Sequence, residues 1–95
     1  MNEKNSDLKS FVLYPNYPNP FNPITTIKYI IPVQSQVKVI IYNSIGEKVG
    51  EVFNGQLEEG YHEVKFNAST LPSGVYFYKM ETKKYNQIKK MILLR

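Results

Sequence analysis

Few residues of this chain could carry out catalysis, and their spacing does not bring them together. His62 is the only histidine among the 95 residues, and it falls on the apolar face of a predicted strand, where packing is its usual role. Glu58 and Glu59 adjoin Gly60 in a predicted turn, but no spaced acidic set supports a calcium site there. The serines have neither a paired base nor a GxSxG turn. We therefore predict that the chain is not an enzyme, binds no metal and uses no cofactor.

Thirteen aromatic residues offer a second kind of chemistry, since exposed tyrosines can stack on sugars or on nucleobases. Most of them fall at alternating positions of predicted strands or among prolines, where core packing explains them. The charge is uneven: residues 79–95 hold six cations and one acid, whereas residues 1–78 have a net charge of −1. A basic end can attract nucleic acid or anionic lipid, but lysines on an edge hairpin also prevent aggregation. We favour the latter and predict no nucleic-acid partner.

Four of the six prolines lie within nine positions, in a segment that also contains three aromatic residues. Each proline fixes φ and lacks an N–H, and it pushes the preceding residue toward an extended conformation. Asparagine side chains can close Asx turns here, and we consider cis peptide bonds before Pro15 and Pro18. We predict a stiff ribbon of turns that packs Tyr17 or Phe21 onto a sheet. This proline segment consists of Tyr14, Pro15, Asn16, Tyr17, Pro18, Asn19, Pro20, Phe21, Asn22 and Pro23.

The remainder of the chain alternates apolar and polar residues with a period of two, as strands do. Together with turn residues every 8–12 positions, this pattern predicts an all-β fold, an antiparallel immunoglobulin-like β-sandwich of about seven strands with essentially no helix. Turns are expected at 43–46, 54–55 and 83–86, and a loop at 67–74. The predicted strands are 11–14, 24–31, 36–43, 47–53, 60–66, 75–82 and 87–94.

The length predicts a single domain over residues 11–95, preceded by a linker remnant at residues 1–10. No apolar stretch approaches the ~18 residues of a membrane span. No signal peptide is visible either, so we expect any export signal to lie outside this chain.

In order and spacing, these pieces resemble the C-terminal sorting domain of the type IX secretion system (Por secretion system), in its type A form. The resemblance covers about residues 12–95. It begins with the proline segment and continues into Thr25–Tyr29. It is completed by Val37–Val49, Leu71–Tyr78 and Lys89–Arg95, although Arg95 stands where the family usually has lysine.

The resemblance implies a domain that directs an exported protein through the type IX outer-membrane translocon. The partners it implies are that translocon, a sortase-like surface protease that removes the domain, and an N-terminal cargo domain. The implied path runs through the periplasm to the cell surface or the extracellular space. The residues it implies for recognition are those of the Gly-x-Tyr element and of the terminal signal, namely Gly74, Tyr76, Lys89, Lys90, Met91 and Leu93.

Two alternatives stay open at this point. An accessory β-sandwich could serve structure or bind carbohydrate on an extracellular hydrolase, and it would tolerate any position in the precursor. A similarity to the immunoglobulin-like domain of flagellar hook-capping proteins also leaves an assembly role, which would require a flagellar partner.

Overall fold

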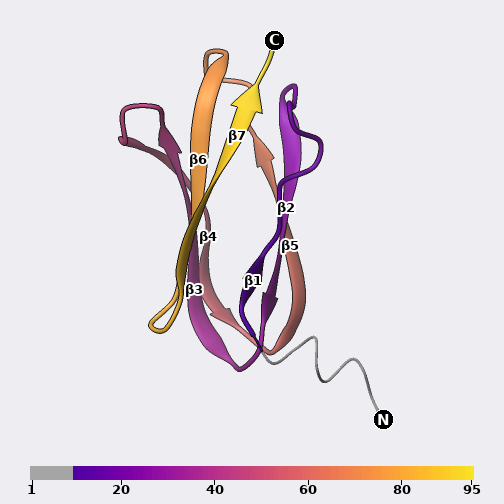
Figure 1. The fold of residues 1–95 in the computed structure, drawn as a ribbon, viewed down its shortest axis with the longest axis vertical. Coiled ribbons are helices and arrows are strands. Elements are labelled where there is room, and N and C mark those ends of the chain that lie inside the picture. The colour runs from indigo at the N-terminus through magenta and orange to yellow at the C-terminus, as the bar shows by residue number, and fades with distance from the viewer. Residues whose placement is uncertain (1–9) are drawn as a thin grey trace.

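The computed structural model describes residues 10–95, so all but the last residue of the predicted linker remnant lies outside the described residues. Within this range the chain forms seven strands and no helix (Figure 1). They are β1 (Val12–Leu13), β2 (Ile24–Ile31), β3 (Ser35–Asn43), β4 (Lys48–Leu57), β5 (Gly60–Asn67), β6 (Gly74–Glu81) and β7 (Asn86–Leu93).

The strands form two antiparallel sheets that face each other (Figure 1). One sheet has three strands in the order β1-β2-β5, and the other has four in the order β4-β3-β6-β7. The chain crosses between the sheets after β2, β4 and β5, while β3-β4 and β6-β7 are hairpins within one sheet. This arrangement confirms the predicted antiparallel immunoglobulin-like sandwich of about seven strands.

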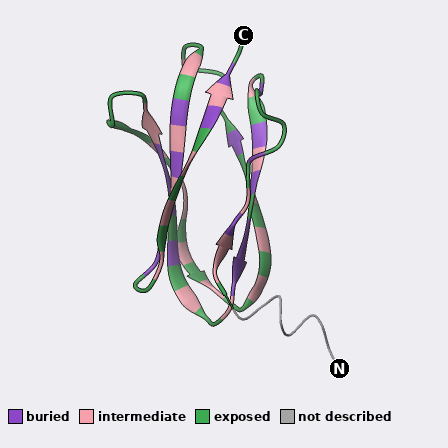
Figure 2. Cartoon of the chain, in the orientation of Figure 1, coloured by how far each residue is buried: buried purple, intermediate pink, exposed green. Residues whose placement is uncertain are grey.

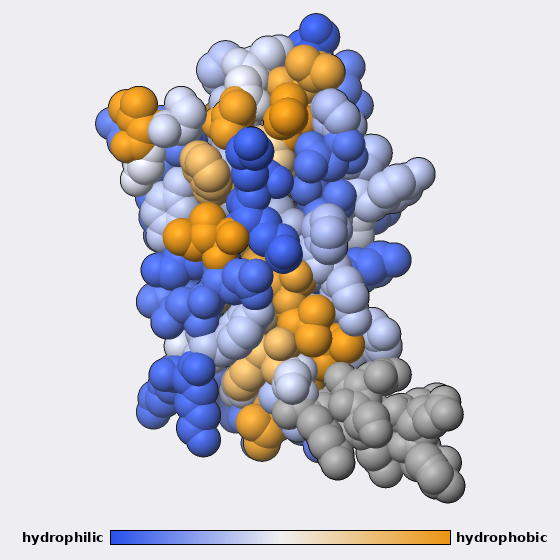
Figure 3. Space-filling view, viewed as in Figure 1, coloured by the Kyte–Doolittle hydropathy of each residue, from blue (hydrophilic) through white to orange (hydrophobic). Residues whose placement is uncertain are grey.

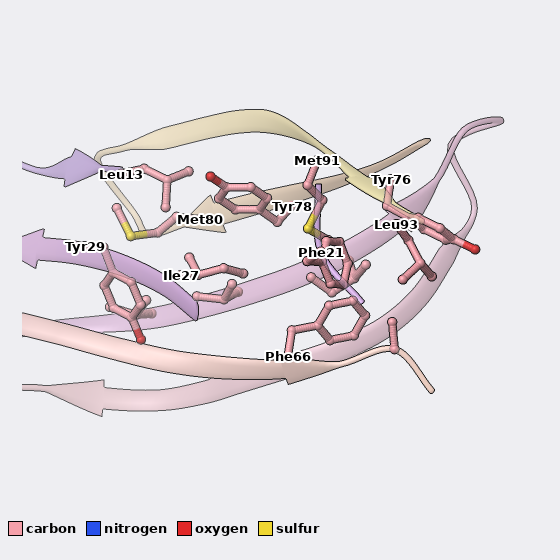
Figure 4. Packing of buried hydrophobic residues seen from close by; sticks show 14 of the residues in the cluster. Leu13, Phe21, Ile27, Tyr29, Phe66, Tyr76, Tyr78, Met80, Met91 and Leu93 are labelled. Atoms are coloured by element: carbon pink, nitrogen blue, oxygen red, sulfur yellow. The ribbon is translucent and has the colours of Figure 1, made fainter. Parts of the chain in front are cut away.

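The core lies between the sheets, and the alternation of the strands supplies it. Every second residue of β6 is buried, as Figure 2 shows in the striping of the strands. Tyr76, Tyr78 and Met80 face inward as the sequence predicts, and they belong to one buried cluster with Met91 and Leu93 of β7 and Phe66 of β5. In Figure 4 Met80 lies beside Leu13 and Tyr29, and Phe21 lies beside Phe66. Burying one such side chain contributes about 1.5–3 kcal/mol relative to leaving it in water. The inward rows of both sheets therefore hold the sandwich together.

The predicted turn at Asn54-Gly55 is wrong, because β4 continues through it to Leu57. Asn54 pairs with Lys38 and Gly55 with Val37, so the long neighbouring strand β3 supplies a ladder that overrides the local turn preference. A side-chain Cβ at Gly55 would lie only 3.3 Å from the ring of Phe53. The glycine thus serves a close approach within a strand. By contrast, the predicted turn at 43–46 is confirmed, with Gly46 at a φ of +87°.

The proline segment crosses from one sheet to the other. Its first half pairs with β2: the backbone N–H of Tyr17 donates to Thr26 O at 3.0 Å, and Thr26 N–H returns a bond of 2.9 Å. Its second half pairs with β7, where Phe21 forms a parallel bridge with Leu93. The ring of Phe21 is 2% exposed and lies beside Phe66, with ring centroids 6.2 Å apart. The prediction that the segment packs a ring onto a sheet is confirmed for Phe21, whereas Tyr17 points into solvent.

The asparagines of the segment do not close Asx turns, contrary to our expectation. Buried Asn16 instead donates from Nδ2 to Thr25 Oγ1 at 2.9 Å and to Pro18 O at 3.2 Å. Asn19 accepts through Oδ1 from the backbone N–H of Ile92 in β7, at 3.0 Å. Hydrogen bonds to residues distant in sequence fix the orientation of these two side chains. Asx turns occur at Asn43 and Asn67 instead.

The peptide bonds before Pro18, Pro20 and Pro23 are cis. The cis bond considered at Tyr17-Pro18 is therefore present, whereas the bond at Tyr14-Pro15 is trans.

Replacing Phe21 by alanine should lower the free energy of unfolding by about 3–5 kcal/mol, because the change empties a buried ring site between the sheets. Tyr17→Ala in the same segment removes a ring that is 78% exposed, and it should change stability by no more than about 0.5 kcal/mol. Urea unfolding of both variants measures this. Equal losses would show that the segment does not anchor the sandwich through Phe21.

Candidate functional site

The six residues that the resemblance implies for recognition all lie on the β6-β7 hairpin. Gly74 pairs with Leu93, and Tyr76 pairs with Met91. Lys89 and Lys90 follow on β7, opposite Tyr78 and Phe77. The structure thus brings these residues together on two neighbouring antiparallel strands.

These residues divide between the two faces of the sheet. Tyr76 is 4% exposed, and Met91 and Leu93 are fully buried, so all three belong to the core. Lys90 is exposed on the outer face, while Lys89 is half-buried on the inward-facing row at the sheet edge. Because side chains alternate along a strand, only part of the implied set can be touched from outside while the domain is folded.

Gly74 and Tyr76 shape the loop that precedes the hairpin. Gly74 has a φ of +154°, which favours glycine, and the following strand begins there. The hydroxyl of Tyr76 donates to Pro72 O at 2.7 Å, four residues back along the chain. This bond closes the 67–74 loop onto β6, as a tyrosine corner does in other immunoglobulin-like sandwiches.

The chain end is held against the same loop. The backbone N–H of Arg95 donates to Ser73 Oγ at 3.0 Å, and its guanidinium donates to Ala68 O at 2.8 Å and to Ser69 O. A planar guanidinium can reach two carbonyls in one fixed geometry, which suits it to this position.

The outer face of the hairpin carries apolar side chains that the sequence reasoning did not single out. Ile88 and Leu94 are more than half exposed. A shallow groove of about 380 Å³ beside Ile88 is lined by Tyr42, Phe77 and Lys79 among others. Over β6 and β7, Figure 3 shows apolar side chains in orange between strongly hydrophilic ones in blue. The sequence signal that could have found these side chains is the two-residue period of β7, which places Ile88, Lys90 and Leu94 in one row.

The edge of β7 that does not pair with β6 is hydrogen-bonded along only part of its length. Near its end, Phe21 N–H donates to Ile92 O at 2.9 Å, and Leu94 N–H donates to Phe21 O at 3.0 Å. Backbone groups on a strand point alternately to its two sides, so Ile88 and Lys90 direct theirs toward the same edge. No strand of the described residues pairs with them there. This leaves an open stretch of strand edge beside exposed lysines and Ile88.

A buried tyrosine ties the hairpin to the proline segment. The hydroxyl of Tyr78 donates to Tyr14 O at 2.7 Å, across the space between the sheets. Burial raises the pKa of Tyr78 to about 12, and it does the same for Tyr29.

The candidate catalytic residues do not assemble into a site. His62 stacks its ring near Tyr29, with centroids 6.0 Å apart, and its Nε2 lies 2.7 Å from Glu58 O. Residues 10–95 contain no group of three or more acidic, histidine or cysteine side chains placed to hold a metal ion. Nor do they contain a helix of the length and apolarity that crossing a membrane requires.

Comparison with known proteins identifies the family of this chain. The model of the family described as "Secretion system C-terminal sorting domain" matches residues 14–94. The chain belongs to this family. It is therefore a C-terminal sorting domain of type IX secretion, and a protein that carries it is exported to the cell surface or the extracellular space. A sorting domain is not itself catalytic, and this leaves open what the whole protein does.

A solved structure supports the same assignment. The chain is similar to part of PorZ, an essential bacterial surface component of the type IX secretion system of Porphyromonas gingivalis. The two are 26% identical, with a TM-score of 0.61, over 87% of this chain and 11% of that chain. The sorting domain thus spans only a small part of that protein's length. No match is found among the curated proteins.

The raised tyrosine pKa predicts how the sorting domain responds to alkali. A tyrosine in the unfolded chain ionises near pH 10, while folded Tyr78 stays neutral to about 12. Its contribution to stability is therefore complete below pH 10 and is lost as the pH rises to 12. Tyr78→Phe should lower stability at pH 7 by about 1 kcal/mol but flatten its decline between pH 10 and 12. Urea unfolding across this range measures both effects.

The control for this experiment is Tyr17→Phe, which alters an exposed hydroxyl and should leave the decline as steep as in the parent. An unchanged slope in Tyr78→Phe would contradict the prediction.

Proposed function

We propose that this sorting domain carries an N-terminal cargo domain across the outer membrane through the type IX translocon, and that a sortase-like surface protease then removes it. A Sec signal peptide elsewhere in the precursor would first bring the cargo into the periplasm. Membership in the sorting family supports the role, and the match over residues 14–94 includes both strands of the hairpin.

The translocon reads the outer face and the open edge of the β6-β7 hairpin in this proposal. The single observation that carries it is the division of the implied residues between the two faces. Met91, Leu93 and Tyr76 are buried, so they act by fixing the hairpin on the core, together with the turn at Gly74. Lys90 is exposed and Lys89 is reachable at the edge, so these two contact the receptor directly.

The chemistry of this surface defines the receptor. Lys79 and Lys90 flank exposed Ile88 on the outer face, and Lys89 lies at the edge, so a complementary surface combines acidic groups with an apolar patch. The open backbone at Ile88 and Lys90 also allows the receptor to add a strand to the edge. Rim charges act mainly on encounter, so substitution of the lysines should slow delivery without unfolding the domain.

A secretion assay tests this proposal. A fluorescent reporter with a Sec signal peptide is fused ahead of residues 1–95 and expressed in a host that has a working type IX system. The parent fusion should place the reporter on the surface or in the medium, without the domain if the protease cleaves it. The double variant Lys89→Ala, Lys90→Ala should retain most of the reporter in the periplasm.

The matched control is Lys28→Ala, Lys65→Ala, which removes the same charge from two exposed lysines of the other sheet. It should be secreted like the parent. Equal retention of both double variants would show that net charge matters rather than the hairpin. Deleting residues 89–95 is less informative, because it also removes Met91 and Leu93 from the core.

A further inference from the structure

Two tyrosines stand exposed on the outer face of the three-stranded sheet, far from the core. Tyr17 is 78% exposed and Tyr61 is 65% exposed, so packing does not account for either ring. Tyr14 lies near Tyr61, with ring centroids 6.5 Å apart and planes within 13° of parallel. The proline segment and β5 thus present three aromatic rings on one face.

A hollow runs along this face between the rings. It has a volume of about 520 Å³ and is lined by Tyr14, Tyr17, Thr26, Lys28 and Glu63 among others. A second hollow of about 380 Å³ shares Lys28 and Glu63 and continues past them to Tyr61 and His62. Both hollows are shallow and open to solvent.

The polar groups in the hollow are not engaged with each other. Lys28 and Glu63 are directly opposite in the register of β2 and β5, yet the ion pair found among residues 10–95 is the one between Lys48 and Glu51. The carboxylate of Glu63, which only accepts hydrogen bonds, therefore lies beside the ammonium of Lys28, which only donates them. Both groups line the hollows between the rings. Thr26 adds a hydroxyl, which can do both.

We infer that this face, built by Tyr14, Tyr17 and Tyr61 around Lys28 and Glu63, is a carbohydrate-binding site. A pyranose ring has an apolar face of C–H groups that stacks on an aromatic ring, and hydroxyls at its rim that both donate and accept hydrogen bonds. The exposed tyrosines supply the stacking surface, and Lys28, Glu63 and Thr26 supply partners for the hydroxyls. Because the two hollows share Lys28 and Glu63, a short oligosaccharide can contact both of them.

The charge of the face distinguishes a sugar from a nucleic acid. Binding a phosphate backbone requires a track of cations, and here the anionic Glu63 lines both hollows. The positive excess of the chain lies instead in residues 79–95, which form part of β6 and all of β7 in the other sheet. The hollows themselves are lined by one cation, Lys28, and one anion, Glu63, which suits a neutral oligosaccharide.

The site is tested by titrating the full chain with five trisaccharides: chitotriose, cellotriose, maltotriose, mannotriose and xylotriose. Backbone amide shifts in NMR spectra report both affinity and location. At least one trisaccharide should give saturable shifts at residues 14–17, 26–28 and 61–63. Tyr61→Ala and Tyr17→Ala should each weaken that binding at least about tenfold, because each removes a stacking ring. Both rings are mostly exposed, so both variants should fold.

Tyr42→Ala is the matched control, since it removes a tyrosine from the other sheet, and it should leave the affinity unchanged. Three outcomes overturn the inference: no shift with any trisaccharide at millimolar concentration, shifts centred on the other sheet, or equal loss of binding in Tyr42→Ala. The site is independent of sorting, so the two tyrosine variants should be secreted like the parent in the reporter assay.

Discussion

The structure depends above all on the contact between the proline segment and the last strand. Phe21 fills the core between the sheets, and its backbone N–H and C=O pair with Ile92 and Leu94. Because β1 and the first half of the same segment pair with β2, one stretch of ten residues fastens the three-stranded sheet to the four-stranded one. A buried aromatic ring and a short backbone ladder therefore act at the same point.

This contact also determines which backbone groups near the end of the chain are accessible to a partner. The segment protects the backbone of Ile92 and Leu94, and Arg95 is bonded to the 67–74 loop, so the carboxyl end is fixed in place. The segment does not reach Ile88 and Lys90, where the edge stays open. An open edge invites pairing with any exposed strand, and the lysines around it discourage unspecific contacts. The fold therefore limits access to one short, charged stretch.

Much of this architecture follows from the sequence, because the alternation of apolar and polar residues along a strand predicts which side chains face the core. That rule places Tyr76, Tyr78 and Met80 correctly, and the turn residues identify the hairpins around Gly46 and residues 83–86. It fails at Asn54-Gly55, where a favourable turn dipeptide is held straight by pairing with Val37 and Lys38. It also cannot assign Asn19, whose partner Ile92 lies 73 residues away. Local preference is overridden wherever a distant strand supplies a better bond.

The candidate site is harder to derive because a family motif does not separate residues that shape a surface from those that contact a partner. Met91 and Lys90 are neighbours in the motif, but β7 sends one into the core and the other into solvent. A substitution that shortens the buried Met91 would loosen the hairpin, whether or not a receptor touches this residue. Loss of function at a motif residue is thus weak evidence of contact. Only exposed residues whose replacement leaves stability unchanged, such as Lys90, can show where the translocon binds.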